Sequence, residues 1–133
     1  CKECKVAYEP HLGELPGVEL VYRWPGARQE APLTTPGALQ LHGLFAEMRA
    51  AGCTHVVLEA SSHALHQGRL AGCRFRAAGL TNVTQDHLDY HGTMEAYADA
   101  KAILFRELLA PGGTGVVFAD REDGRRMRAA IAG

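Results

Sequence analysis

Short apolar runs alternate with helix-like segments along most of this chain, and that order constrains the fold more than any other feature. The runs at 18–23, 55–60, 76–81 and 115–119 have the length and the β-branched, aromatic or small apolar residues of strands. Strands that are joined by helices pair in parallel. The order therefore predicts an α/β fold, with a mostly parallel sheet and helices on both of its faces.

Capping and turn residues divide the chain further. Thr34-Thr35-Pro36 has the composition of a helix N-terminus, and apolar residues recur at helical spacing from there to Gly52. Thr93 has the position of a cap for the next long helix. The other expected elements are a loop over 24–33, a short helix or turn over 61–70, a long helix over 94–109, a tight turn over 111–113 and a final helix over 122–132.

Length and charge set the limits on domain count and partners. The chain has 133 residues and a net charge of -1. We expect an irregular lead-in over 1–17, which is interrupted by prolines and glycines, and one domain over 18–133. The charge gives no case for nucleic acid or an anionic membrane, and no apolar run approaches membrane-spanning length. The chain begins with Cys rather than Met, so we expect a fragment of something longer.

Four cysteines raise the question of a metal or a disulfide. Cys1 and Cys4 form one Cys-x-x-Cys pair, but Cys53 and Cys73 do not form the second pair that a zinc ribbon needs. The simpler interpretation is that of thiols in a reducing cytoplasm, with Cys53 and Cys73 as small core residues. We therefore expect a cytoplasmic protein.

Lys101 interrupts an otherwise apolar stripe of a helix. The stripe consists of Met94, Tyr97, Lys101, Leu104 and Leu108. A lysine in such a place must extend past the apolar seam, pair, or lose its charge. Burial lowers the pKa of a lysine towards neutrality, where its amine becomes a nucleophile. A reactive amine and an ordinary extended lysine both remain open.

A polar loop and a strand end supply candidate metal ligands. His87 and His91 are four residues apart, but Gly92 follows and no helix is indicated, so this spacing alone is weak. Glu59 ends the run at 55–60, and the carboxyl ends of parallel strands meet at one edge of a sheet. Glu59, His87 and Lys101 at that edge would form a mixed oxygen and nitrogen site, which suits Mg²⁺. A hydrogen-bonding loop histidine is the simpler alternative for His87.

The segment after Glu59 has the residues of an anion site. Ser61 and Ser62 open a helix whose amides can hold an anion, and Arg69 can clamp a carboxylate or phosphate in bidentate fashion. Ordinary capping with a solvated arginine is the alternative. The chain contains neither Gly-x-x-x-x-Gly-Lys-Ser/Thr nor Gly-x-Gly-x-x-Gly, so nothing in it cradles nucleotide phosphates by itself.

Three motifs together resemble the Mur ligases. They are Thr34-Thr35-Pro36, the stretch from Glu59 to Leu65, and the stretch from Thr81 to Glu95 followed by Ala100-Lys101. The resemblance implies an incomplete central domain of the P-loop type, spanning 18–133, from a three-domain ATP-dependent amide ligase. In that family a carboxylate is phosphorylated and then attacked by an amine, and the closest members add the third peptide residue in peptidoglycan synthesis.

The resemblance also implies a role for each matching residue. Glu59 and His87 would hold Mg²⁺, Asn82 would lie on the nucleotide side with ATP, and Lys101 would take up CO₂ to become a carbamate. The residues implied to hold the UDP-muramoyl dipeptide are Thr34, Thr35, Ser61, Gln67 and Arg69. The incoming amino acid would be diaminopimelate or lysine. The residues of this chain indicate no oligomeric state.

Two other functions remain open from the sequence. Residues 1–17 do not resemble the phosphate-binding loop that the family carries ahead of the first strand, so the chain alone is expected to be inactive. A non-catalytic binding module that has lost this loop would have the same sequence features. A hydrolase with a metal held by Glu59, His87 and His91 is the third possibility.

Overall fold

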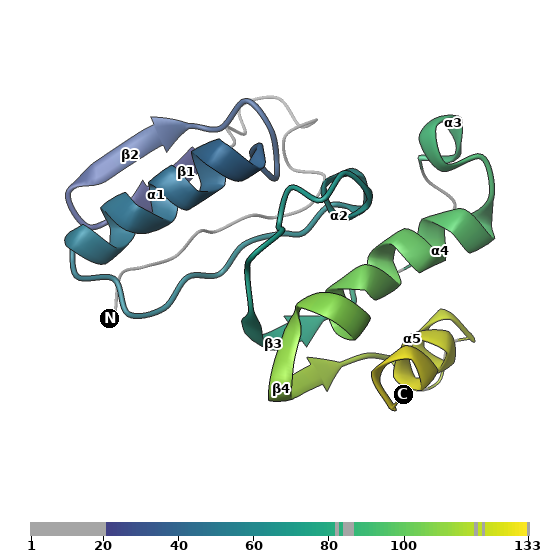
Figure 1. Cartoon of the computed structure of the whole chain (residues 1–133). Helices are drawn as coiled ribbons and strands as arrows, with labels where there is room; N and C mark the ends of the chain where they lie inside the picture. Colours follow the sequence, from purple (N-terminus) through teal and green to yellow (C-terminus); the bar gives the residue numbers. More distant parts are fainter. Residues whose placement is uncertain (1–20, 82, 84–86, 119, 121, 133) are drawn as a thin grey trace. The chain divides into compact units, whose positions relative to one another are not determined.

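The computed structural model of the chain describes residues 21–81, 83, 87–118, 120 and 122–132 (Figure 1). It divides into two compact units, Cys1–Ser61 and Ser62–Gly133, which are treated separately below. The expected lead-in over 1–17, the pair Cys1 and Cys4, and Asn82 lie outside the described residues.

A hairpin opens the described part of the first unit. Strands β1 (Val21–Trp24) and β2 (Ala27–Glu30) pair antiparallel, with Trp24 opposite Ala27 across a turn that contains Gly26 at φ 80°. The expected loop over 24–33 is therefore wrong. Its proline and glycine form the turn between two strands, because a glycine accepts the positive φ that such a turn requires.

Helix α1 (Ala38–Ala50) packs against this hairpin. Its buried residues Leu44 and Met48 form a small core with Tyr22 and Trp24. The expected start at Thr34-Thr35-Pro36 is wrong, because the helix is preceded by Gly37 and has no side-chain cap. The expected end at Gly52 is confirmed, since this glycine has φ 84° immediately after the final turn.

The predicted strand over 55–60 is not a strand in this structure. No ladder includes these residues, and the side chains of Val56 and Val57 are 38% and 65% exposed. A buried parallel strand needs hydrogen-bonded neighbours on both sides. In the described part of the first unit, the ladder joins β1 to β2 instead.

The second unit contains parallel strands joined through helices, which confirms the α/β class. Strands β3 (Phe75–Gly79) and β4 (Leu109–Val116) pair in parallel, with Gly79 opposite Val116. The helical elements are α2 (Ser62–His66), α3 (Leu88–His91), α4 (Met94–Ile103), the π-helical turn η2 (Leu104–Leu108) and α5 (Glu122–Ala132). Because η2 ends directly at β4, the helix and strand follow one another without a loop.

Several predictions for this unit are confirmed and two are wrong. Thr93 caps α4 by accepting a hydrogen bond from the Ala96 amide at 3.1 Å, and the final helix lies where we expected it. The turn predicted over 111–113 lies inside β4, where the pairing register shifts between Phe75 and Ala77. His91 lies in α3, although no helix was indicated there, because Gly92 at φ 75° ends that helix instead of preventing it.

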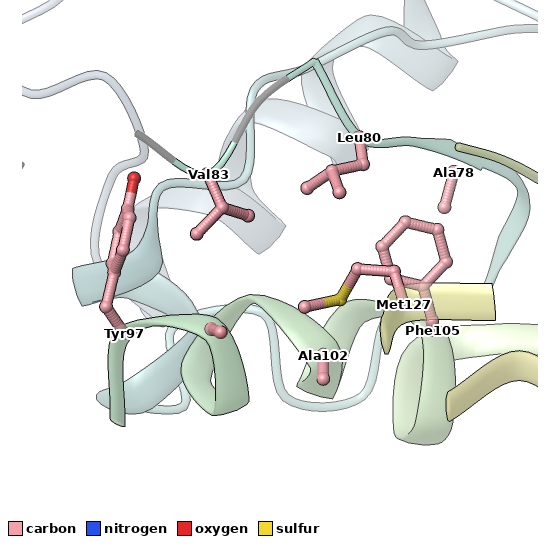
Figure 2. Packing of buried hydrophobic residues seen from close by; sticks show 8 residues of the cluster. Ala78, Leu80, Val83, Tyr97, Ala102, Phe105 and Met127 are labelled. Carbon is pink, nitrogen blue, oxygen red and sulfur yellow. The ribbon is translucent and has the colours of Figure 1, made fainter. Parts of the chain in front are cut away.

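An apolar core holds α4, η2 and α5 against β3. Ala78 and Leu80 of the strand region meet Ala102 and Phe105 from the helical segment and Met127 from α5 (Figure 2). Figure 2 shows the side chain of Met127 extending between Leu80 and Ala102. Met127 is fully buried, and burying such a side chain contributes about 1.5–3 kcal/mol. This core fixes the helix that carries Lys101.

Helix length bears on the membrane prediction. Among the described residues, no helix combines the length and the apolar character that a membrane crossing requires.

Candidate functional site

In the first unit, Thr35 joins two of the three motifs. Its side chain is 1% exposed, and its Oγ1 donates to the Glu59 carbonyl at 2.8 Å and accepts from the Ser61 amide at 3.1 Å. Ser61 Oγ lies 3.4 Å from the same hydroxyl. Thr35 is therefore directed at the backbone, where it positions Ser61. Thr34, its neighbour, is half-buried.

Glu59 has one buried carboxylate oxygen, Oε2. Moving a carboxylate oxygen out of water is costly unless a cation or a hydrogen-bond donor compensates its charge. The Glu59 carbonyl is held by Thr35, which fixes the backbone from which this side chain projects. The donor chemistry of Glu59 fits a hard divalent cation.

In the second unit, α2 and α3 lie against each other through polar side chains. Gln67 Oε1 accepts from Arg69 Nε at 2.8 Å and from Arg69 Nη2 at 2.5 Å. Gln67 Nε2 donates to the Tyr90 hydroxyl at 3.1 Å, and that hydroxyl lies 2.9 Å from His66 Nδ1. The structure thus brings together Gln67 and Arg69, two of the expected substrate-binding residues.

His87 precedes α3 in an unusual backbone conformation. Its φ is 55° and its ψ 26°, and it is the non-glycine residue with positive φ in the described part of the chain. The left-handed region costs an ordinary residue of order 1–3 kcal/mol and is found most often at functional sites. The His87 ring lies edge-on to His63, with centroids 4.9 Å apart. The conformation supports a functional role for His87.

Lys101 lies half-buried on α4, with its ammonium 5.0 Å from the centroid of the Tyr97 ring. Of the three outcomes expected for a lysine on this stripe, pairing is therefore observed, in the form of a cation–π contact. The His87 ring approaches the same tyrosine, with centroids 6.2 Å apart. Tyr97, which is 3% exposed, is thus shared by two expected site residues.

Sequence reasoning missed this role of Tyr97 and treated it as one more apolar member of the stripe. A usable signal was present, because Tyr97 and Lys101 are four residues apart on a helix and such pairs meet on one face. The contact between Tyr90 and Gln67 carried no comparable signal, because it joins residues 23 apart in the sequence.

His91 has a structural role. Its Nε2 lies 3.0 Å from the hydroxyl of Ser62, which is 2% exposed. Burial, followed by the charges of His63 and other neighbouring histidines, lowers the pKa of His91, while Asp89 opposes the shift. Among the residues that the structure describes, no three His, Cys, Asp or Glu side chains are grouped to hold a metal. The hydrolase alternative, which needs His91 as a ligand, gains no support.

Comparison with known proteins identifies the class that this fold and these motifs define. The Mur ligase middle domain matches residues 12–133, so the chain belongs to that family. The resemblance seen in the sequence is confirmed.

Individual relatives narrow the comparison. The chain is 54% identical over 111 residues to a protein of Gloeobacter violaceus named UDP-N-acetylmuramoyl-L-alanyl-D-glutamate--2,6-diaminopimelate ligase. That match covers 84% of this chain and 22% of the relative. A ligase of the same name from Lawsonia intracellularis is 47% identical over 108 residues, and the match covers 81% of this chain and 22% of the relative. The chain therefore spans about a fifth of the length of these relatives.

A solved structure agrees with these relatives. A structure described as UDP-N-acetylmuramoyl-L-alanyl-D-glutamate--2,6-diaminopimelate ligase has a TM-score of 0.66 and 38% identity to this chain. The match covers 83% of this chain and 23% of the chain in that structure.

Proposed function

We propose that the protein containing this chain is an ATP-dependent amide ligase of peptidoglycan synthesis. It adds diaminopimelate as the third amino acid of UDP-N-acetylmuramoyl-L-alanyl-D-glutamate. The observation that carries the proposal is the identity of 47–54% to ligases of that name over more than four fifths of this chain. The sequence motifs left diaminopimelate and lysine open, and the names of the relatives favour diaminopimelate.

Four residues would bind the UDP-muramoyl dipeptide, and a fifth would position one of them. Thr34, Ser61, Gln67 and Arg69 carry hydroxyl, amide and guanidinium groups, which suit the phosphates and carboxylates of such a substrate. Thr35 would act indirectly, because its hydroxyl is buried and bonded to the backbone at Glu59 and Ser61.

Glu59 and His87 would hold Mg²⁺, which neutralises negative charge on a transferring phosphoryl group when bound. The buried Glu59 oxygen and the constrained backbone of His87 support this assignment. Asn82 would lie on the nucleotide side with ATP.

The neutral amine of Lys101 would add to CO₂ with loss of one proton, forming a carbamate anion. Tyr97 lies against this amine and would limit where the carbamate can point.

We place the protein in the cytoplasm, where its nucleotide-linked substrate would be made and used. Cys53 and Cys73 are thiols with no disulfide between them, which suits a reducing compartment. We propose small-molecule partners only, with no nucleic acid and no membrane.

The test is phosphate release by the full-length protein in the presence of ATP, the UDP-muramoyl dipeptide and diaminopimelate. We expect release to require all three, and Arg69→Ala to raise the KM for the dipeptide. If neither diaminopimelate nor lysine supports turnover, the proposal is contradicted.

A hybrid protein distinguishes the ligase from the binding module. Residues 21–132 would replace the matching segment of the Gloeobacter violaceus relative, and an active hybrid would support the ligase. A hybrid that binds the dipeptide without turnover would support the module.

A further inference from the structure

Tyr90 of α3 contacts the segment around the end of α2, which carries the substrate-binding candidates Gln67 and Arg69. Its hydroxyl contacts Gln67 Nε2 at 3.1 Å and His66 Nδ1 at 2.9 Å, both from the α2 region. Its ring lies against the His63 ring at a centroid distance of 4.1 Å. The hydroxyl is therefore held by ring stacking as well as by hydrogen bonds.

The direction of the hydrogen bonds that Gln67 makes follows from the chemistry of Arg69. A guanidinium donates only, so the atom of Gln67 that faces Arg69 must be the carboxamide oxygen. The amide nitrogen then faces Tyr90 and donates to its oxygen. The same hydroxyl lies 2.9 Å from His66 Nδ1, and the direction of that hydrogen bond depends on the tautomer of His66. The donors therefore point the same way from Arg69 through Gln67 to Tyr90.

This order restricts the orientation of Arg69. A Gln carboxamide can rotate by 180° with almost no change in shape, which would turn its NH₂ group towards the guanidinium. The Tyr90 oxygen, at 3.1 Å from Nε2, favours the orientation in which Oε1 receives both Arg69 bonds. Because a guanidinium is planar, fixing Nε and Nη2 also fixes the direction of its remaining edge.

We propose that Tyr90 is a positioning residue for the UDP-muramoyl dipeptide, acting through Gln67 to orient Arg69. The proposal rests on the proposed function, since it assumes that Gln67 and Arg69 bind this substrate. It goes beyond the sequence analysis, which gave Tyr90 no role of its own. It also assigns a role to α3, which carries Tyr90. The His91–Ser62 contact of 3.0 Å holds this helix against α2 next to Tyr90.

Kinetics of the full-length ligase test the proposal. Tyr90→Phe keeps the ring and removes the hydroxyl, so we expect the KM for the UDP-muramoyl dipeptide to rise by about three- to tenfold. The KM for ATP and the kcat at saturating dipeptide should stay unchanged. A partial loss of folded enzyme would instead lower the apparent kcat and leave the dipeptide KM unchanged. Unchanged dipeptide KM would overturn the proposal.

A double variant shows whether Tyr90 acts through Gln67. In a Gln67→Ala background the hydroxyl has no amide to orient, so Tyr90→Phe should add no further increase in KM. An equal increase in both backgrounds would mean that Tyr90 acts on its own, against the proposal. If Gln67→Ala and Arg69→Ala themselves leave the KM unchanged, the assumed substrate site is wrong, which identifies a failure of the proposed function.

A matched control and a structural measurement complete the design. Thr54→Val removes another exposed hydroxyl that lies 2.9 Å from a histidine Nδ1, that of His55, and should leave the dipeptide KM unchanged. In NMR spectra of the full-length protein, Tyr90→Phe should shift the Gln67 side-chain amide and Arg69 Nε–H signals, while Thr54→Val should not. Unshifted signals in Tyr90→Phe would overturn the proposal without any need for activity.

Discussion

At the scale of single residues, the backbone conformation of His87 favours a functional reason for this residue over a purely structural one. A histidine has no advantage over glycine in the left-handed region, and the Cβ of any other residue is strained there. The residue that folding alone would favour at this position is glycine. The presence of histidine therefore supports its proposed role as a ligand.

Replacing His87 tests this interpretation. His87→Gly and His87→Ala both remove the imidazole, and we expect both to lose most ligase activity. His87→Gly should be the more stable of the two by about 1 kcal/mol in urea unfolding, because glycine relieves the strain. An alanine variant as stable as the glycine variant would mean that the conformation is not strained.

Thr35 also acts through the backbone. Thr35→Val keeps the shape of the side chain but leaves the Ser61 amide and the Glu59 carbonyl without their hydroxyl partner. Losing a buried partner costs about 1–3 kcal/mol, which we expect to see as lower stability in urea unfolding. Thr35→Ser keeps the hydroxyl and serves as the control. Equal stability of the valine variant and the wild type would refute the positioning role.

At the scale of elements, we expect substitutions at two helical glycines to have opposite effects on stability. A Cβ on Gly124 of α5 would overlap the Phe118 carbonyl, whereas a Cβ on Gly43 of α1 would meet nothing within 4 Å. We expect Gly124→Ala to lower the melting temperature and Gly43→Ala to raise it, the latter by contributing about 0.5–1 kcal/mol of helix stability. Calorimetry measures both changes. A stabilised Gly124→Ala variant would contradict the close approach.

Elements with local signals were the predictable ones. The Thr93 cap and the apolar spacing identified α4, and the charged final segment identified α5. The run over 55–60 has strand composition but no ladder, because pairing depends on neighbours that composition does not specify. In the site, Lys101 and His87 stood out by residue type. The contact between Tyr97 and Lys101 follows from their spacing on one helix, whereas the contact between Tyr90 and Gln67 depends on tertiary packing.

At the scale of the whole molecule, acidification should weaken the fold. The chain has seven histidines, and His63, His66, His87 and His91 are gathered in one set of ring contacts in the second unit. Because the pKa of His91 is lowered from 6.5 in the folded chain, the unfolded chain binds this proton more readily. His91 thus contributes stability that is present above about pH 6.5 and is lost as the pH falls below it.

Urea unfolding at several pH values measures this effect. The free energy of unfolding should decrease from pH 7 to pH 5, and His91→Gln should reduce the slope because its side chain does not titrate. His42→Gln provides the control, since His42 is exposed on α1 and outside the histidine group. A slope that is the same in His91→Gln and the wild type would assign the effect to other groups.

The π-helical turn η2 bears on how this family varies in length. A turn of this type holds one more residue than an α-helical turn between the same hydrogen-bonding positions. It lies after Lys101 and immediately before β4, so a residue gained or lost within Leu104–Leu108 changes the helix type without moving the lysine away from Tyr97. We therefore expect alignment gaps between relatives to fall in this segment and the spacing from His87 to Lys101 to remain constant.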